Sequence, residues 1–272
     1  MIRNLTTRPS HDIGRQEASL RIAGATTSLR NELHRLIRDD PTFAVRTHVP
    51  RGGAAYNSGD HDLRMYLVEV GQFKTIASSA DGKQCLLSIH TRGDMFGELG
   101  LLGGPRHDTA RAMRDSVIRR VNSAKLFDVL SSDEQLNWHF TRFLMAKLLD
   151  QQQAITQLVT MDSEHRLAAT LLRLARKVGR RLNLGMQIDA KITQEELASM
   201  VGTTRSRVGL FLKHFRAAKL VDQLPGGYLL INEPALTRYV ECGQYEPARW
   251  GAEPIRPVNG ARLLRGDREL SA

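Results

Sequence analysis

The sequence of 272 residues lacks the features of a secreted, membrane-spanning or disulfide-bonded protein. Its two cysteines, Cys85 and Cys242, are far apart in the chain and fit neither a disulfide framework nor a metal site, so we expect a reducing cytoplasm. No apolar run is long enough to cross a bilayer, and the N-terminus lacks the apolar core of a secretory signal. No nucleophile stands with an acid or a base in a recognisable arrangement, so we do not expect an enzyme.

Positive charge is what the chain has in excess. The net charge is +10 and the isoelectric point is about 10.0, which favours a polyanionic partner such as nucleic acid. Hydrophobic residues make up 41% of the chain and charged residues 25%, as in ordinary globular proteins. The length leaves room for about two domains, each able to bury its own core.

A stretch centred on Gly202 predicts a helix-turn-helix. Thr193 stands where a helix N-cap would, and Glu196 follows at the position of a capping box, so we expect a first helix there. Gly202 supplies a sharp turn, and a second helix then opens at Thr203 or Thr204. Two short helices about a glycine turn are typical of a motif whose second helix enters the DNA major groove.

The second helix of this motif has two different faces. Apolar residues recur at helical spacing and predict a buried face that consists of Val208, Phe211, Leu212 and Phe215. The opposite side carries Arg205, Ser206, Arg207, Leu210, Lys213 and Arg216. No acidic residue occurs from Thr203 to Lys219. Taken alone, such a basic helix could equally be a solvated surface.

The residues that follow favour the DNA-binding interpretation. Residues 220–224 and 228–231 are apolar runs that predict two strands, and Pro225-Gly226-Gly227 between them predicts a tight turn. A β-hairpin directly behind a helix-turn-helix is a wing. We therefore expect a winged helix-turn-helix domain over residues 161–232, with a hinge at Met161–Ser163, a helix over His165–Val178 and a plain connection over Arg180–Gln187.

The first half of the chain has the texture of a β-roll or jelly roll. Short alternating runs broken by glycine-rich turns predict strands over Phe43–Val49, Met65–Val70, Gln72–Ala77, Gln84–Ile89, Ala110–Met113 and Ser116–Val121. Asp81-Gly82 is the strongest hairpin signal. We expect a mobile arm over residues 1–27 and a sensor domain over residues 28–130 that opens with a short helix at Ser28–Ile37.

A long helix is expected between the two domains, over residues 131–160. Ser132 and Gln135 resemble a capping box at its start, and neither proline nor glycine interrupts it. One small roll cannot cover so long an apolar side, so we expect the same helix of a second chain to pack against Leu144, Leu148, Ile155 and Leu158. Packing within one chain is the alternative. After Ile231 the chain is rich in Pro, Gly and Arg, so we expect a disordered tail over residues 233–272.

In this order, the elements resemble the CRP/FNR-type bacterial transcription regulators. The run from Arg92 to Leu101, RGDMFGELGL, is similar to the entry of that family's phosphate-binding cassette. The runs TQEELA from Thr193 and GTTR from Gly202 are similar to its helix-turn-helix. The resemblance covers about residues 40 to 232. It implies an α+β fold with an antiparallel roll, a long dimerisation helix and a C-terminal winged helix-turn-helix.

The resemblance implies a ligand site that is only partly kept. Glu98 matches the glutamate that binds ribose in cyclic-nucleotide-binding members, and Thr109 and Ala110 match two residues of the phosphate site. Asp108 takes the place of the phosphate-binding arginine, and a carboxylate repels a phosphate. The implied ligand-binding residues are Gly97, Glu98, Leu99, Thr109, Ala110, Gln151 and Gln152. We therefore expect no certain cofactor and disfavour a cyclic nucleotide.

Other sensors of such regulators find few ligands in this sequence. An iron–sulfur member would need four cysteines. A haem ligand remains open among nine histidines, none of which stands in a recognisable setting. A roll could gather histidines around a metal, but those in or near the predicted strands lack close pairing: His48, His61, His90 and His107. We expect no metal site.

For the recognition helix, the resemblance implies individual roles. Arg205 matches the family's guanine-reading arginine. Ser206 stands where many members have Glu, and Leu210 where many have Arg, so the half-site should depart from the best-known consensus. Phosphate anchors fall at Thr193, Gln194 and Thr204. The set of expected DNA-binding residues is Thr193, Gln194, Thr204, Arg205, Ser206, Arg207, Leu210 and Lys213.

The leading hypothesis is a cytoplasmic, homodimeric, sequence-specific transcription regulator. Its partners would be double-stranded DNA with a palindromic operator, a second copy of the chain and RNA polymerase. We expect no membrane partner. One alternative is a cyclic-nucleotide or other small-ligand sensor that acts on a protein partner through its basic face. Another is a jelly-roll metalloenzyme fused to a DNA-binding domain, which would need a tight histidine cluster.

Overall fold

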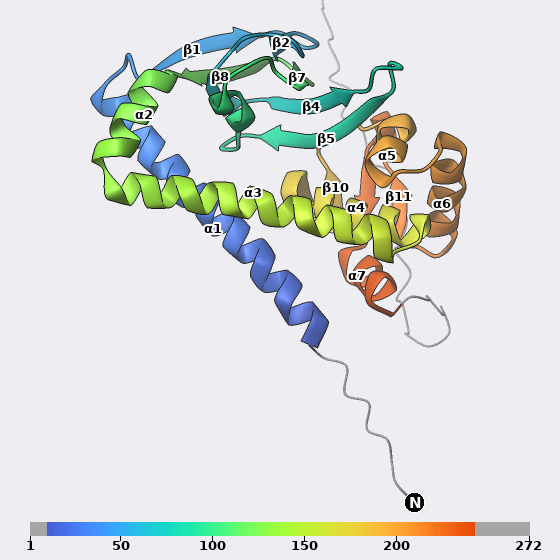
Figure 1. Ribbon diagram of the computed structural model, residues 1–272. Coiled ribbons are helices and arrows are strands. Elements are labelled where there is room, and N and C mark those ends of the chain that lie inside the picture. Colours follow the sequence, from blue (N-terminus) through green and yellow to red (C-terminus); the bar gives the residue numbers. More distant parts are fainter. Residues whose placement is uncertain (1–9, 243–272) are drawn as a thin grey trace, which may run out of the picture.

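The computed structural model describes residues 10–242, with side chains over residues 24–241. Figure 1 shows a β-roll and a helix-rich domain side by side, with one long helix running beneath both. Antiparallel sheets, the long helix and a C-terminal helix-turn-helix confirm the predicted α+β fold. None of the described helices is long and apolar enough to cross a membrane.

Two antiparallel sheets form the roll. Its strands are β1 (Ala44–Val49), β2 (Ala54–Tyr56), β3 (Met65–Val70), β4 (Gln72–Ser78), β5 (Gln84–Thr91), β6 (Met95–Phe96), β7 (Asp108–Ala112) and β8 (Ser116–Val121). One sheet has the order β1-β8-β3-β6 and the other the order β2-β7-β4-β5. The predicted strands are all present, with ends within two residues, and Asp81-Gly82 joins β4 to β5. β2 and β6 were not predicted, because strands of three and two residues are too short to show an alternation of apolar and polar residues.

An aromatic core fills the space between the sheets. The rings of Tyr66 and Phe96 stack with centroids 5.2 Å apart, and Phe73 lies 5.3 Å from Phe96. Val68 and Ile118 are buried in the same cluster. The tight packing of these rings fixes the strands on which the ligand-binding positions of the roll stand.

The first helix, α1 (Ser10–Asp39), is longer than the sequence indicated. The prediction of a mobile arm over residues 1–27 is wrong from Ser10 onward, because those residues continue the helix expected over 28–37. These residues include many good helix formers, but their apolar residues do not recur at helical spacing, and that spacing was the basis of the helix prediction. Residues 1–9 lie outside the described part. The apolar side of α1 joins the roll core through Leu29, Leu33 and Ile37.

Two helices follow the roll: α2 (Ser123–Ser132) and α3 (Glu134–Thr160). The capping box predicted for Ser132 and Gln135 is wrong. Asp133 caps α3, and its carboxylate accepts a hydrogen bond of 2.9 Å from the Leu136 amide. Ser132 instead ends α2, and its hydroxyl donates to the Asp128 carbonyl. Ser132 therefore belongs to α2, a helix that the sequence did not predict, and cannot be the N-cap of α3.

The C-terminal domain consists of helices and a small sheet. Its elements are α4 (Ser163–Val178), β9 (Gly179–Leu182), β10 (Gly185–Ile188), α5 (Gln194–Val201), α6 (Arg205–Ala217), β11 (Val221–Gln223), β12 (Leu229–Ile231) and α7 (Glu233–Cys242). The expected plain connection over Arg180–Gln187 is wrong, since those residues form the hairpin of β9 and β10. β10 pairs with β12, so the hairpin extends the wing into a sheet of order β11-β12-β10-β9.

The disordered tail predicted over residues 233–272 is wrong for residues 233–242. Residues 233–242 form α7, which buries Ala235 and Leu236 in the core of the C-terminal domain. Composition did not indicate this helix, because Pro234 and the polar residues after it are typical of a disordered segment. The remainder of the predicted tail, residues 243–272, lies outside the described part.

Candidate DNA interface and ligand pocket

The first helix of the helix-turn-helix begins as predicted. The Thr193 hydroxyl accepts a hydrogen bond of 3.1 Å from the Glu196 amide, and the Glu196 carboxylate accepts one of 2.8 Å from the Thr193 amide. This reciprocal pair confirms the capping box. Gly202 ends α5 in the left-handed conformation, with φ of 70°, which other residues adopt only at a cost. The chain can therefore turn sharply into α6.

The second helix, α6, separates its apolar and polar sides as the sequence indicated. Thr204 is its N-cap and accepts from the Arg207 amide. Val208, Phe211, Leu212 and Phe215 are buried, which confirms the predicted inward face. The outward side chains are exposed: Arg205, Ser206, Arg207, Leu210 and Lys213.

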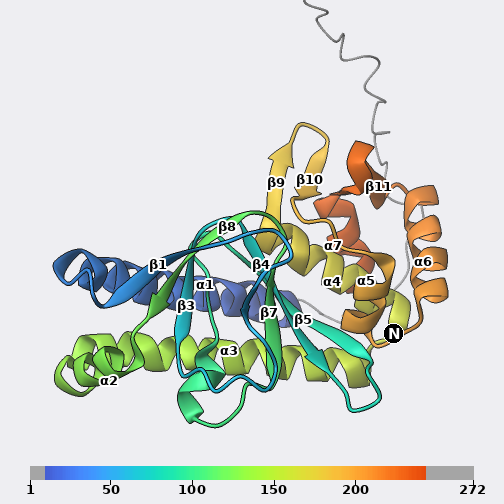
Figure 2. The same ribbon diagram turned by 90° about the horizontal axis from the view of Figure 1, so that it is seen from above.

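The exposed face of α6 is free to bind an anion. In the described part of the chain, no ion pair engages Arg205, Arg207 or Lys213. α6 lies at the outer edge of the molecule in two perpendicular views (Figures 1 and 2), away from the roll. A helix of this kind can approach a DNA groove without displacing another element.

The wing stands directly behind α6. β11 and β12 pair antiparallel, and Pro225–Gly227 form the turn between them, as predicted. Lys191 lies over the ring of Tyr228, 5.5 Å from its centroid, so the wing carries a further cation. Lys191 stands in the loop between β10 and α5, and no pattern in the sequence marks its contact with Tyr228, which follows the turn of the wing.

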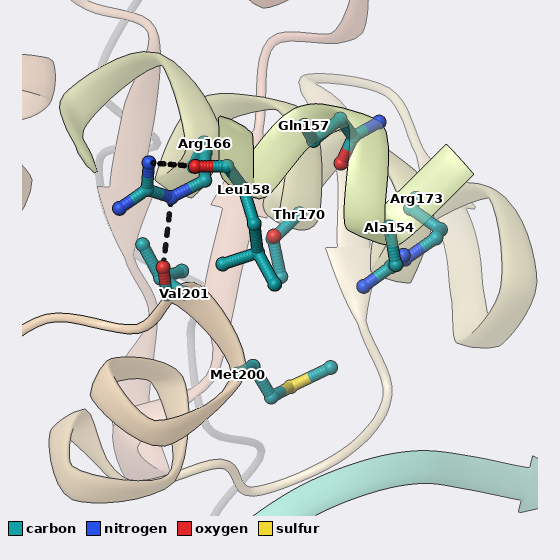
Figure 3. Close-up of a pocket in the computed structure, with 8 residues that line it drawn as sticks. All are labelled: Ala154, Gln157, Leu158, Arg166, Thr170, Arg173, Met200 and Val201. Atoms are coloured by element: carbon teal, nitrogen blue, oxygen red, sulfur yellow. Dashed lines mark hydrogen bonds between the residues drawn. The ribbon is translucent and has the colours of Figure 1, made fainter. Parts of the chain in front are cut away.

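Arg166 holds the hinge between the long helix and the DNA-binding motif (Figure 3). Its Nε donates to the Val201 carbonyl at 2.8 Å, and its Nη1 donates to the Leu158 carbonyl at 3.3 Å. One side chain thus joins the ends of α3 and α5. The cavity beside it is about 30 Å³, enough for ordered water but not for a ligand.

The helix-turn-helix is docked against the roll. Lys74 of β4 pairs with Glu196 of α5 at 2.6 Å, so the carboxylate that completes the cap also contacts the sensor domain. The Leu86 amide of β5 donates to the Ser199 hydroxyl at 3.1 Å. Hydrogen bonding from Lys74 and from the Thr193 amide lowers the pKa of Glu196, although partial burial opposes this.

The long helix α3 leaves an apolar stripe uncovered within one chain. Leu144, Leu148, Ile155 and Leu158 are 39%, 60%, 61% and 50% exposed. Their spacing of four, seven and three residues places them along one side of the helix. This observation fits the predicted interface with a second copy, which stays a prediction.

The ligand positions of the roll are only partly gathered. Glu98 pairs with Lys147 of α3 at 3.3 Å, and its Oε2 is buried without a hydrogen-bond partner in the described part. The Thr109 hydroxyl accepts from the Ser58 amide at 3.0 Å. Gly97 has a positive φ and Ala110 is fully buried, whereas Leu99, Gln151 and Gln152 are exposed. The assignment of these seven residues to a ligand stays a prediction.

Asp108 lies at the place where the resemblance calls for a cation. Burial raises the pKa of Asp108, and the nearby Glu98 adds to this, while a hydrogen bond from Tyr56 and the charge of Arg106 oppose it. The Tyr56 hydroxyl is 3.3 Å from the Asp108 carboxylate. Two carboxyl groups therefore share a partly buried region, which disfavours an anionic ligand.

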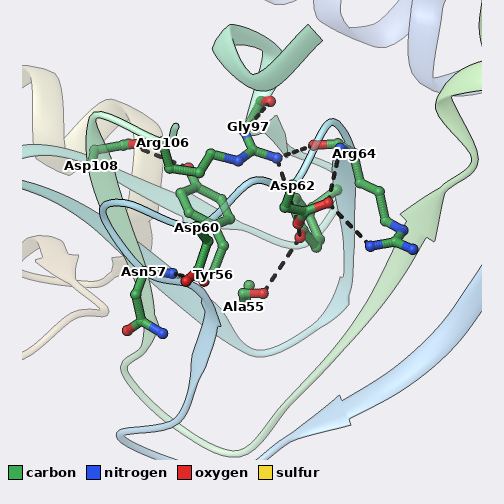
Figure 4. A network of polar contacts seen from close by, with 10 residues as sticks. Ala55, Tyr56, Asn57, Asp60, Asp62, Arg64, Gly97, Arg106 and Asp108 are labelled. Carbon is green, nitrogen blue, oxygen red and sulfur yellow. Dashed lines mark hydrogen bonds and ion pairs between the residues drawn. The ribbon is translucent and has the colours of Figure 1, made fainter. Parts of the chain in front are cut away.

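Arg106 is the residue whose role the sequence did not reveal (Figure 4). It is 4% exposed, and its guanidinium lies 4.2 Å from the centre of the Tyr56 ring. It donates to the Gly97 carbonyl at 2.6 Å and to the Arg64 carbonyl, and Asp62 lies 3.7 Å away. A side chain on Gly100 would collide with the guanidinium, so the glycine there makes room for it. The sequence alone does not distinguish a buried arginine from an exposed one. Gly100 was the one local sign that a side chain packs closely against this turn.

One histidine of the roll, His90, lies inside the core. His90 is buried, stacks on Phe96 with centroids 5.0 Å apart and lies 3.3 Å from the Thr75 hydroxyl. Burial lowers the pKa of His90 well below its ordinary value. The described residues contain no group of three or more His, Cys, Asp or Glu side chains placed to hold a metal ion.

Two family models match the chain. Residues 46–133 match the cyclic nucleotide-binding domain, and residues 165–239 match the Crp-like helix-turn-helix domain. The CRP-like cAMP-activated global transcriptional regulator of Mycobacterium tuberculosis is 28% identical over 185 residues, which are 68% of this chain and 82% of that protein. The cAMP-activated global transcriptional regulator CRP of Pasteurella multocida is 28% identical over 192 residues, covering 67% and 91%.

Solved structures show the same fold at low sequence identity. FixK2 from Bradyrhizobium japonicum superposes with a TM-score of 0.63 at 18% identity and covers 72% of this chain and 96% of its own. A CooA mutant from Carboxydothermus hydrogenoformans has a TM-score of 0.61 at 21% identity, covering 73% and 88%. With a roll, a long helix and a winged helix-turn-helix in this order, the chain belongs to the CRP/FNR family and is a CRP-like transcription regulator.

Proposed function

We propose that the protein binds double-stranded DNA as a homodimer, with α6 of each copy in the major groove. The observation that carries this proposal is the exposed face of α6, which has unpaired cations and no acidic residue. In this arrangement two half-sites about 34 Å apart receive two symmetry-related helices, so the operator is palindromic. The stripe on α3 supplies the contact between copies.

Within this complex the residues of the helix-turn-helix have separate tasks. Arg205 stands in the first turn of α6 and donates to O6 and N7 of a guanine, which is the contact a guanidinium makes best. Ser206 and Leu210 face neighbouring bases, and Arg207 and Lys213 approach phosphates. Thr193, Gln194 and Thr204 anchor the backbone through the amino ends of the two helices.

The proposed dimer uses a heptad-like seam. Leu144, Leu148, Ile155 and Leu158 alternate in steps of four and three once Gln151 is included. A single polar residue in such a seam fixes the register of the two helices at some cost in stability. This gives Gln151 a task in the dimer even without a ligand.

The roll is proposed to work without cAMP, although the relatives named above are cAMP-activated. Asp108 stands where an anionic ligand would need a cation, and Glu98 adds a second negative charge. The alternative is a small-ligand sensor that acts on a protein partner through this basic face. The wing behind α6 and the position of Arg205 in its first turn argue against that alternative. As part of the regulator proposal, the protein works in the cytoplasm, contacts RNA polymerase at its promoters and needs no catalytic activity.

Selection of bound fragments from random DNA tests the proposal. We expect an enriched palindrome whose half-site centres are one helical turn apart, with or without cAMP in the buffer. The affinity for that palindrome should exceed the affinity for random DNA by at least about 10³ at physiological salt. Retention without sequence preference, or no retention, would favour the protein-partner alternative.

A further inference from the structure

An open cleft of about 410 Å³ lies at one end of the roll, separate from the Glu98 region. Six of its lining residues come from three segments far apart in the sequence: Thr42, Val45, Leu63, Arg64, Arg120 and Ser123. Its volume lies in the range of small-molecule sites, and the mouth of a β-barrel is a common place for such a site. The predicted ligand positions, such as Glu98 and Thr109, do not line it.

Arg120 is the notable charge in this cleft. It is partly buried on β8, where its strand partners are Val45 of β1 and Tyr66 of β3. Within the described chain, no hydrogen bond or ion pair of its side chain is found. Its neighbour Arg119, by contrast, pairs with Glu69 at 2.6 Å. A partly desolvated guanidinium without a counter-charge favours the binding of an anion.

The rest of the cleft complements a phosphate that carries an organic group. Arg64 adds a second guanidinium, which donates to Asp62 at 3.2 Å and keeps other donors open to the cleft. The Ser123 hydroxyl supplies a further donor. Val45 and Leu63 are 60% and 45% exposed and give the cleft an apolar wall. Two cations beside a hydroxyl and an apolar wall match a phosphomonoester better than a lone carboxylate.

The carboxylate in the cleft, that of Asp62, already has cationic partners. Asp62 accepts from Arg64 and from the Tyr66 hydroxyl, and it lies 3.7 Å from the buried Arg106. Asp40, which accepts a hydrogen bond from the lining residue Thr42, pairs with Lys125. His61 also lines the cleft. After these pairs are formed, the positive charge of Arg120 is left over.

We propose that this cleft binds a small phosphorylated metabolite through Arg120 and Arg64. The site differs from the pocket that the resemblance implies. Its lining includes Val45 of β1 and Ser123 of α2, two elements that lie at the opposite end of the molecule from α6 (Figure 2). Asp62 connects it to the cassette, because the same carboxylate faces Arg64 in the cleft and Arg106, which holds Gly97. The proposal does not depend on DNA binding.

Calorimetric titration of the full chain with phenyl phosphate tests this site. We expect saturable binding of one molecule per chain, weakened roughly tenfold or more by Arg120→Gln, because a charge-assisted pair is lost. Arg119→Gln is the matched control: it removes a neighbouring arginine on the same strand and should leave the affinity within about twofold. Arg64→Gln serves as a second variant if Arg120→Gln fails to fold.

Three results would overturn the assignment. One is the absence of saturable binding to the wild type up to about 10 mM phenyl phosphate at constant ionic strength. Another is equal affinity in Arg120→Gln and Arg119→Gln. The third is tighter binding of benzoate than of phenyl phosphate, which would make the site one for carboxylates. DNA is absent from every titration, so failure here is distinct from failure of the regulator proposal.

Discussion

The arginines of α6 and the buried Arg106 of the roll have opposite surroundings. On α6, Arg205 and Arg207 are exposed and have no ion pair in the part of the chain that the structure describes. In the roll, Arg106 is buried, and carbonyl oxygens and a tyrosine ring occupy its guanidinium. A guanidinium binds a new anion only with free donors. The comparison therefore assigns recognition to α6 and internal support to Arg106.

The same comparison shows why net charge alone says little about function. The 39 lysines and arginines include cations that are paired with acids, such as Lys74 and Arg119, and cations that face solvent. Only the second kind contributes to attracting DNA.

Separating the two copies should have the largest effect, because the α6 surfaces of a dimer act together. Leu148→Glu or Ile155→Glu should give monomers, and operator affinity should fall toward the non-specific level, a loss of about 10³ or more. Sedimentation and mobility-shift assays measure the two effects. Leu102→Glu, at an exposed position of the roll, is the control. A monomeric wild type at micromolar concentration would contradict the dimer.

Removing the buried arginine should damage the fold rather than recognition. Arg106→Met leaves the Gly97 carbonyl without its partner and removes one of the two cations beside Asp62, so the free energy of unfolding should fall by about 3 kcal/mol. Urea denaturation measures this change. Arg111→Met, at an exposed arginine of β7, should cost much less. If the two variants are equally stable, Arg106 does not support the cassette.

Removing an α6 arginine should do the reverse. Arg205→Ala should cost about 1–3 kcal/mol of operator affinity and relax the preference at one position of each half-site, without loss of stability. Selection from random DNA and competition binding measure both effects. Arg216→Ala, in the last turn of the same helix, is the matched control and should keep the base preference. Equal weakening on operator and random DNA would reduce Arg205 to a phosphate contact.

Asp108 should make stability depend on pH in a defined direction. Burial raises the pKa of Asp108 in the folded state above its ordinary value of 3.8. Such a group stabilises the fold fully below its unfolded pKa and loses that contribution as the pH rises through the folded pKa. The wild type should therefore lose stability relative to Asp108→Asn as the pH rises above about 4. A stability difference that is constant from acid to neutral pH would speak against this burial.

cAMP should have no effect at all. A phosphate beside Asp108 and Glu98 is opposed by several kcal/mol, so calorimetry with cAMP or cGMP should show no saturable heat. Operator affinity should also be the same with and without either nucleotide. Asp108→Arg is the informative partner, because it restores the cation at that position. Micromolar affinity of the wild type would mean that another arginine takes the phosphate.

Local signals in the sequence predicted most of the fold. Thr193 and Glu196 predicted the capping box, and the spacing from Val208 to Phe215 predicted the buried side of α6. Both features depend only on residues that are close together along the chain. The same holds for the strands with clear alternation. The errors lie where two local signals compete, as at Ser132 and Asp133, or where a helix has little apolar period, as in residues 10–27.

The site was predictable only to the extent that its residues are neighbours along the chain. The exposed set on α6 follows from one helical period. The pairs Lys74–Glu196 and Glu98–Lys147 join residues far apart in sequence, and no pattern marks them in advance. Arg106 stands in the loop before β7, and its burial depends on Tyr56 at the end of β2. Such contacts are properties of the assembled roll rather than of any segment.

The apolar residues beneath the contact of α5 with the roll have a consequence for evolution and design. Leu86 and Ile89 of β5 belong to the same buried cluster as Leu197, Ala198 and Phe215 of the DNA-binding domain. The two domains are therefore not interchangeable modules joined by a linker. A chimera that exchanges the sensor of one such regulator for that of another must keep β5 and α5 matched, or it exposes an apolar patch on both halves.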